Sequence, residues 1–209
     1  MRVAIIGSGN VGKALAGSLT KAGHEVTLTA TTPESAQAAA DQTGAQGAKS
    51  NQAAVESAEV VVLAVPYPAL DGLLDDVGDH LDGKVVVDAT NRMNPNDFGA
   101  TLDGTSATEQ IQAKLPGARV VKAFNTLFAS RQADPVVDGV ALDALVAGDD
   151  EDAKRQVLKL AESIGLRPID AGPACMARAM EALALLNITL QIRNNWPWQA
   201  GFKLVGPTP

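Results

Sequence analysis

Short runs of aliphatic residues alternate with amphipathic segments along most of the chain. Continuous apolar runs are typical of parallel strands that are covered on both faces. The intervening segments carry apolar residues every three or four positions, which is the helical period. The runs predict strands at 3–6, 24–29, 45–48, 59–65, 84–88, 119–125, 142–147 and 167–170. The helical spacing predicts helices after the first strand and at 34–43, 50–58, 69–81, 106–115, 151–164 and 174–193, with residues 91–105 as a loop.

Regular alternation of strand and helix predicts an α/β fold, a Rossmann-type doubly wound and mostly parallel sheet. Residues 1–172 contain the complete alternation and are expected to form the dinucleotide-binding domain. Residues 173–209 form a short C-terminal portion with one helix and a tail. That helix is apolar on more than one side, so a core helix and a subunit interface both fit it.

A glycine-rich loop joins the first strand to the first helix. It reads Gly7, Ser8, Gly9, Asn10, Val11 and Gly12. In the G-x-G-x-x-G pattern the first glycine permits the tight turn and the second admits a pyrophosphate to the backbone. The third lets the helix pack closely on the strand. Because a strand precedes the loop and a helix follows it, the pattern predicts a dinucleotide site with the phosphates at the helix N-terminus.

The end of the second strand distinguishes NAD from NADP in such sites. An acidic residue there binds the ribose hydroxyls of NAD, whereas arginine or small polar residues accommodate the 2′-phosphate of NADP. Here Ala30, Thr31, Thr32 and Ser35 follow the strand, and Glu34 lies beyond its end. NADP is therefore expected and NAD stays open. The alternative role of the hydroxyls is to cap the second helix.

Composition limits the remaining functions. The chain has 209 residues, a net charge of −7, one cysteine and two histidines. This balance disfavours a nucleic-acid or anionic-membrane partner. One cysteine excludes an internal disulfide, and no metal-ligand spacing occurs. We expect no transmembrane helix and no removable leader, since the first strand belongs to the core, and hence a cytoplasmic protein.

No acid–base constellation stands out, and hydride transfer between two redox cofactors needs positioning more than protein proton transfer. The reacting rings are expected at the carboxyl ends of the strands. These ends carry Val65, Pro66, Ala89, Asn91, Ala123, Asn125 and Thr126. The two asparagines are candidates for orienting a carboxamide, with turn formation as the alternative. Lys122 fits either a catalytic base or a partner of a carboxylate, and His24 a structural role.

Four motifs resemble those of the NADP-dependent oxidoreductases of coenzyme F420, and the chain is also similar to the cytoplasmic domain of the six-transmembrane metalloreductases. These motifs are the glycine loop and residues 120–125, 148–150 and 165–173. The resemblance implies a nicotinamide near Val65 and Pro66, with a deazaflavin or flavin stacked over it. Residues 125–129 and 196–204 would bound this second cofactor. It also implies direct hydride transfer and a homodimer.

The chain departs from this family at two places. Family members commonly carry Ser-Arg or Arg-Arg after the second strand, where this chain has Ala30, Thr31 and Thr32. F420 reducers often carry a histidine at the position of Asn125. The first departure weakens the expected preference for NADP, and the second leaves F420 and FMN both open as the co-substrate.

The sequence therefore predicts an NAD(P)-dependent oxidoreductase that exchanges hydride with a deazaflavin or flavin. A small-molecule imine or pyrroline-carboxylate reductase is the first alternative. Those enzymes need a long helical second domain, and about 40 residues after Gly172 are few for a domain of at least ~50. A non-enzymatic dinucleotide-binding redox sensor is the second alternative.

Overall fold

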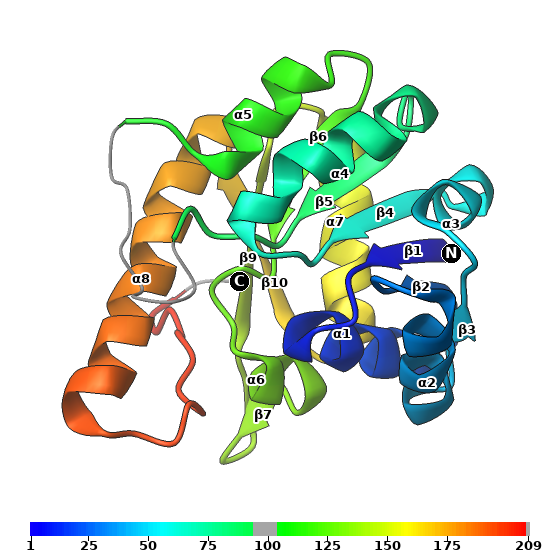
Figure 1. Cartoon of the computed structure of the whole chain (residues 1–209). Helices are drawn as coiled ribbons and strands as arrows, with labels where there is room; N and C mark the ends of the chain where they lie inside the picture. Colours follow the sequence, from blue (N-terminus) through cyan, green and yellow to red (C-terminus); the bar gives the residue numbers. More distant parts are fainter. Residues whose placement is uncertain (94–103, 208–209) are drawn as a thin grey trace.

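The computed structural model describes residues 1–93 and 104–207, so most of the predicted loop 91–105 lies outside the described residues. Its centre is an eight-stranded sheet with the order β10-β9-β6-β5-β4-β1-β2-β3 (Figure 1). The strands are β1 (Arg2–Ile6), β2 (Glu25–Thr29), β3 (Gln46–Gly47), β4 (Val60–Leu63), β5 (Val85–Asp88), β6 (Arg119–Ala123), β9 (Asp143–Gly148) and β10 (Arg167–Gly172). Neighbouring strands are parallel except β6 and β9. The predicted Rossmann-type sheet is confirmed.

Helices cover both faces of the sheet. On one face lie α1 (Asn10–Lys21), α2 (Pro33–Thr43) and α7 (Glu151–Ser163), and on the other α3 (Asn51–Ser57), α4 (Leu70–Val77) and α5 (Ala107–Lys114). Successive strand residues serve opposite faces, as the period of two requires. Val60 and Val62 pack in the first core cluster, and Val61 and Leu63 in the second. This double burial explains the continuous apolar runs in the sequence.

Some connecting elements do not appear in the sequence prediction. They are α6 (Ala129–Ala133) and the hairpin of β7 (Val136–Val137) with β8 (Val140–Ala141). Elements of two to five residues are too short to show a period. Helix α6 packs against α1. It lies directly after the end of β6, at the edge of the sheet where ligands are expected.

The C-terminal helix α8 (Ala177–Asn194), orange in Figure 1, lies at the side of the molecule opposite β3. Its buried face is partly polar and includes Glu181, Asn187 and Gln191, while Leu186 and Ile192 are each 50% exposed. The segment 174–194 is long and apolar enough to cross a membrane by length and composition alone, with 39% of its most apolar window buried. The core helix of a protein without a membrane span can have the same length and composition, so the expectation of no transmembrane helix stays a prediction.

Candidate active site at the carboxyl ends of the strands

The glycine loop has the geometry that the motif predicts. Gly7 has a φ of 111°, and a Cβ there would lie 2.5 Å from the carbonyl oxygen of Ala64. A Cβ on Gly12 would lie 1.8 Å from the carbonyl oxygen of Gly7, so α1 reaches the loop only because Gly12 has none. At Gly9 the Cβ position meets no atom within 4 Å among the described residues. The loop is thus closed on the protein side and open at Gly9, where a phosphate would approach.

The first turn of α1 is free to bind an anion. Gly9 is the N-cap residue, and no side chain caps the helix. The unpaired N–H groups of a helix N-terminus, together with its partial positive charge, favour phosphate. Asn10 and Val11 begin the helix and line the adjoining cavity. This terminus therefore fits the pyrophosphate of a dinucleotide.

A first cavity of about 460 Å³ lies on one side of the glycine loop. It is bounded by the loop, the ends of β2 and β4, and helices α3 and α4. Its lining includes Gly7, Ser8, Gly9, Ala30, Thr31, Val65, Pro66, Asn51, Gly72 and Asp76. Among the described lining residues, Asp76 is the single ionisable one. The cavity has the position expected for the adenosine half of a dinucleotide. Val65 and Pro66, which the family resemblance places near the nicotinamide, line this cavity and not the second one, so their contact with the nicotinamide stays a prediction.

Two of the predicted cofactor residues serve the helix instead of the cavity. The backbone N–H of Ser35 donates to Thr32 Oγ1 at 3.2 Å, and the Thr32 hydroxyl donates to Ser35 Oγ at 3.1 Å. Thr32 is thus the N-cap of α2, which is the alternative role considered for it. Neither residue lines the first cavity, whereas Thr29 at the end of β2 and Thr31 just after it both do.

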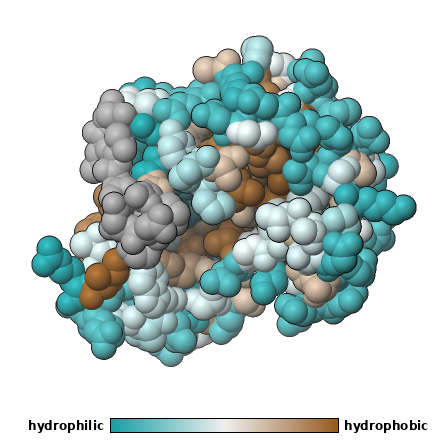
Figure 2. Space-filling view, viewed as in Figure 1, coloured by the Kyte–Doolittle hydropathy of each residue, from teal (hydrophilic) through white to brown (hydrophobic). Residues whose placement is uncertain are grey.

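A second cavity of about 470 Å³ lies on the other side of the loop. Figure 2 shows an apolar hollow in the middle of this face, surrounded by more hydrophilic residues. Its described lining residues carry no ionisable side chain and include Asn10, Val11, Ala89, Asn91, Phe124, Asn125, Thr126, Phe128, Ile188 and Trp198. The loop after β6 and residues 197–199 of the C-terminal segment therefore bound one cavity, as the family resemblance implies. Ala123 is fully buried and lies outside the described lining of both cavities.

Two aromatic rings form one wall of the second cavity. Phe128 and Trp198 meet edge to face with their centroids 5.3 Å apart. Ser130 Oγ donates to the carbonyl oxygen of Trp198 at 2.8 Å, which ties the C-terminal segment to α6. Trp196 is 46% exposed and does not line the cavity. Of the two tryptophans, only Trp198 is thus placed to cover a planar ring.

Asn91 and Asn125 are brought together at the floor of this cavity. Asn125 Nδ2 donates to Asn91 Oδ1 at 2.9 Å and to the carbonyl oxygen of Met180 at 3.1 Å. Asn91 Nδ2 donates to the carbonyl oxygen of Asn125 at 3.2 Å. Asn125 Oδ1 is buried and has no hydrogen-bond partner among residues 1–93 and 104–207. The pair joins the ends of β5 and β6 to α8, and its role toward a ligand stays a prediction.

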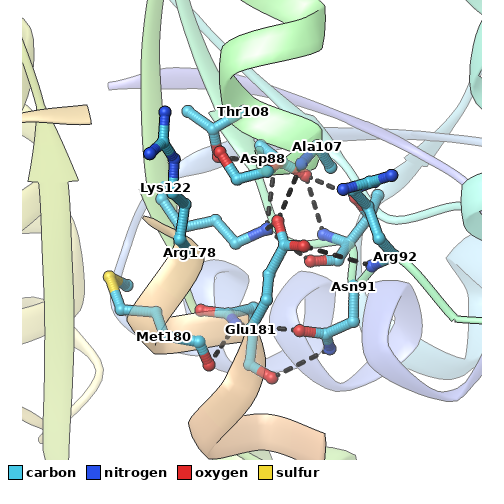
Figure 3. A network of polar contacts seen from close by, with 12 residues as sticks. Asp88, Asn91, Arg92, Ala107, Thr108, Lys122, Arg178, Met180 and Glu181 are labelled. Carbon is cyan, nitrogen blue, oxygen red and sulfur yellow. Dashed lines mark hydrogen bonds and ion pairs between the residues drawn. The ribbon is translucent and has the colours of Figure 1, made fainter. Parts of the chain in front are cut away.

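Lys122 is a buried structural cation and not an accessible base. Its ammonium contacts Asp88 Oδ2 at 3.0 Å, Glu181 Oε1 at 2.9 Å and the carbonyl oxygen of Thr90 at 2.5 Å (Figure 3). Lys122 and Asp88 have no exposed side-chain surface, and Glu181 has 7%. Pairing with carboxylates, the second role considered for Lys122, is what the structure shows.

Glu181 is the member of this network that the sequence analysis missed. Its Oε1 also accepts a hydrogen bond from the backbone N–H of Ala107 at 2.9 Å, in the first turn of α5. A carboxylate at a helix N-terminus is favourably placed. Glu181 stands in a largely apolar helical run, and a lone charge in such a run is the signal that indicates a buried partner.

Helix α8 makes a further ionic contact with α5 near its N-terminus. Arg178 Nε donates to Glu109 Oε2 at 2.8 Å, and a second nitrogen contacts Oε1 at 2.5 Å. These hydrogen bonds lower the pKa of Glu109 despite the opposing effect of its partial burial. His24 lies at the opposite end of the sheet, where Nε2 is 2.9 Å from Ser163 Oγ, in keeping with its predicted structural role.

The glycine loop and the start of α1 would hold a dinucleotide beside an uncharged cavity at the carboxyl ends of the strands. This arrangement is typical of oxidoreductases that use a nicotinamide dinucleotide. Residues 2–92 match the family described as NADP oxidoreductase, coenzyme F420-dependent. The F420-dependent NADP reductase of Methanothermobacter marburgensis is 35% identical over 93% of this chain and 94% of its own. The chain belongs to this family and is an NADP-dependent oxidoreductase, as predicted.

Further comparisons agree with this assignment. A crystal structure of a putative F420-dependent NADP reductase from Arthrobacter sp. superposes with a TM-score of 0.88 at 30% identity, covering 99% of this chain and 100% of that one. The rat metalloreductase STEAP3 is 33% identical over 88% of this chain and 36% of its own length. An imine reductase from Pseudomonas sp., with a TM-score of 0.70 at 20% identity, shares the fold.

Proposed function

We propose that the protein catalyses direct hydride transfer between NADPH and a deazaflavin of the F420 type, or a flavin such as FMN. The observation that carries this proposal is the second cavity, which adjoins the glycine loop and presents aromatic and aliphatic side chains without an ionisable group among its described residues. Such a lining suits two stacked planar rings and offers no protein acid or base. NADPH supplies the hydride, and the residues supply position and exclusion of water.

Each part of the site has a role in this proposal. The N–H groups at the start of α1 would bind the pyrophosphate, and Thr31 would face the ribose of the adenosine half. Ala89 and Val11 would lie beside the nicotinamide, with Asn91, Asn125 and Thr126 as positioning residues at the floor. Phe128 and Trp198 would cover the acceptor ring. The segment 173–209 would thereby complete the acceptor site of the domain formed by residues 1–172.

The small-molecule reductase alternative fits the second cavity less well. Reduction of an imine requires a proton donor for nitrogen as well as a hydride. Among the described lining residues none can supply that proton from an ionisable side chain. The sensor alternative is not favoured because the family consists of oxidoreductases.

We also propose a homodimer formed through α8. Met176, Leu183, Leu186 and Leu190 follow one another at intervals of seven, three and four residues, which is a heptad seam. Met176 is 40% and Leu186 is 50% exposed, although both are large and apolar. The same seam on a second copy would bury them. Leu186→Glu should shift the mass measured by light scattering from dimer to monomer. We also propose a cytoplasmic location for the enzyme, which is the expectation from the sequence.

The decisive experiment traces deuterium from the nicotinamide of NADPH to the acceptor. The protein is mixed with F420 and NADPH deuterated at either face of nicotinamide C4, and the products are analysed by mass spectrometry. Direct transfer predicts deuterium in the reduced deazaflavin, bound to carbon and therefore not exchanging with water. Oxidation of NADPH in parallel assays with FMN and FAD defines the acceptor class. Absence of NADPH oxidation with all three acceptors would overturn the proposal.

A further inference from the structure

The wall of the first cavity formed by α4 contains a glycine that the helix itself does not need. Gly72 lies inside α4, and glycine within a helix costs about 1 kcal/mol relative to alanine. A Cβ at Gly72 would meet no atom of the described residues within 4 Å, so close packing among them does not require glycine there. Gly72 lines the cavity beside Ala69 and Leu73. Together these residues present a low apolar surface against which a flat ring can lie.

Asp76 stands one helical turn beyond Gly72 and lines the same cavity. Its Oδ2 accepts from Asn51 Nδ2 at 3.0 Å, and its Oδ1 accepts from Gln52 Nε2 at 3.0 Å. The Gln52 amide also donates to the backbone carbonyl oxygen of Asp76 at 3.1 Å. Two amides from α3 thus orient the carboxylate. Each carboxylate oxygen keeps a further lone pair that can accept a hydrogen bond from a ligand.

In a dinucleotide the pyrophosphate is followed by the ribose and then by the base, so the wall formed by α4 is the place for the base. The glycine loop at one end of the cavity is the place for the pyrophosphate, and Thr31 at the end of β2 is the place for the ribose. The base then reaches Gly72, Leu73 and Asp76. We infer that Gly72 and Asp76 form a base-recognition site, in which an aminopurine lies over Gly72 and donates its exocyclic amine to the Asp76 carboxylate.

This inference rests on the proposed function and adds a selectivity to it. Adenine carries an amine at position 6, which is a donor, whereas hypoxanthine carries a carbonyl oxygen, which is an acceptor. A carbonyl oxygen facing the carboxylate of Asp76 would leave two acceptors opposed without a hydrogen. The protein therefore selects adenine dinucleotides against their oxopurine analogues.

The test compares the dissociation constants of NADPH and of reduced nicotinamide hypoxanthine dinucleotide phosphate by calorimetry. The wild-type protein should bind NADPH at least tenfold more tightly. Asp76→Asn should reduce this preference to below threefold, because the new amide can donate to the oxopurine. Asp75→Asn is the matched control, since Asp75 pairs with Lys114 outside the cavity and its loss should leave the preference intact.

A second variant tests the wall without changing a charge. Gly72→Leu should weaken NADPH binding at least tenfold and leave binding of reduced nicotinamide mononucleotide, which has no adenosine, unchanged. Equal affinity of the wild type for both dinucleotides, or a preference that survives Asp76→Asn, would overturn the inference. Failure of the wild type to bind NADPH at all would instead contradict the proposed function, so the two failures are distinguishable.

Discussion

The side-chain amide of Gln132 donates a hydrogen bond to the carbonyl oxygen of Phe124, at 3.0 Å, inside the protein. Phe124 is 1% exposed and has a φ of 65°, a left-handed conformation that is unfavourable for a bulky residue. The same amide donates to the carbonyl oxygen of Leu127 at 3.1 Å. Gln132 therefore holds closed the strained turn that forms one side of the second cavity.

Replacing this amide should disturb the acceptor site before the dinucleotide site. Gln132→Met keeps the length of the side chain but removes a donor from two carbonyl oxygens, of which that of Phe124 keeps the backbone N–H of Leu127 at 3.3 Å. The loss should cost about 2 kcal/mol in the free energy of unfolding. We expect the KM for the acceptor to rise at least fivefold with an unchanged dissociation constant for NADPH. Steady-state kinetics and calorimetry measure the two quantities. A parallel loss of NADPH binding would show that the turn serves the whole site.

A side chain at Gly9 should affect dinucleotide binding without affecting the stability of the fold. Gly9→Val should leave thermal stability nearly unchanged, because no atom in the part of the chain that the structure describes lies within 4 Å of the new Cβ. It should abolish detectable dinucleotide binding. Gly17→Val is the matched control, since Gly17 lies in the same helix and also has open space around it. Calorimetry with NADPH checks both variants. Unchanged affinity in the Gly9 variant would contradict the placement of the pyrophosphate.

The preference for NADPH over NADH should be modest, and a substitution at Thr31 should change it. With Asp76 as the single ionisable residue in the described lining of the first cavity, no cation is present there to bind a 2′-phosphate. We expect NADPH to be preferred over NADH by less than about 100-fold, or about 2.7 kcal/mol. Thr31→Arg should increase this ratio through a charge-assisted contact. A fall in NADPH affinity at constant NADH affinity would show that residue 31 does not face the ribose.

Trp198 should matter to the acceptor and not to the dinucleotide. Trp198→Ala removes one wall of the second cavity, so we expect at least tenfold slower turnover with a deazaflavin or flavin at nearly unchanged NADPH affinity. Acceptor binding should quench the fluorescence of the wild type. The quenching should persist in Trp196→Phe, whose side chain lies outside the cavity, and disappear in Trp198→Phe. The opposite pattern would move the acceptor away from this wall.

Acid should destabilise the protein through Asp143. Burial raises the pKa of this carboxyl group, but hydrogen bonds from Arg167, the backbone N–H of Leu204 and Lys203 outweigh it and lower the pKa from 3.8 to about 2. Because the folded-state pKa is depressed, the stabilisation is present above pH 4 and is lost as the pH falls toward 2. The difference corresponds to about 2 kcal/mol.

Urea unfolding of the wild type and of Asp143→Asn measures this contribution. The variant should be less stable by about 2 kcal/mol at pH 7, and the two proteins should converge near pH 2. The C-terminal segment should also lose its attachment in the variant, since Lys203 and Leu204 both donate to Asp143. A stability difference that is independent of pH would contradict the ionic origin of the effect.

The sequence by itself determined the sheet, its helices and the glycine loop. Apolar runs such as 60–63 report burial on both faces, and G-x-G-x-x-G between a strand and a helix reports a backbone that must approach a phosphate. These are local signals, because each depends on residues within about 15 positions of one another. They were sufficient to place the ligand-binding edge, since parallel strands end at the same side of a sheet.

Only the tertiary structure decided which distant residues meet. Three features join positions far apart in the chain. They are the antiparallel pairing of β9 with β6, the ion pair of Lys122 with Glu181, and the position of Asp76 in the same cavity as the glycine loop. A charge in a helical run has the same local pattern whether it faces water or a buried partner. Packing selects between these environments, and packing depends on the whole fold, which no short window of sequence contains.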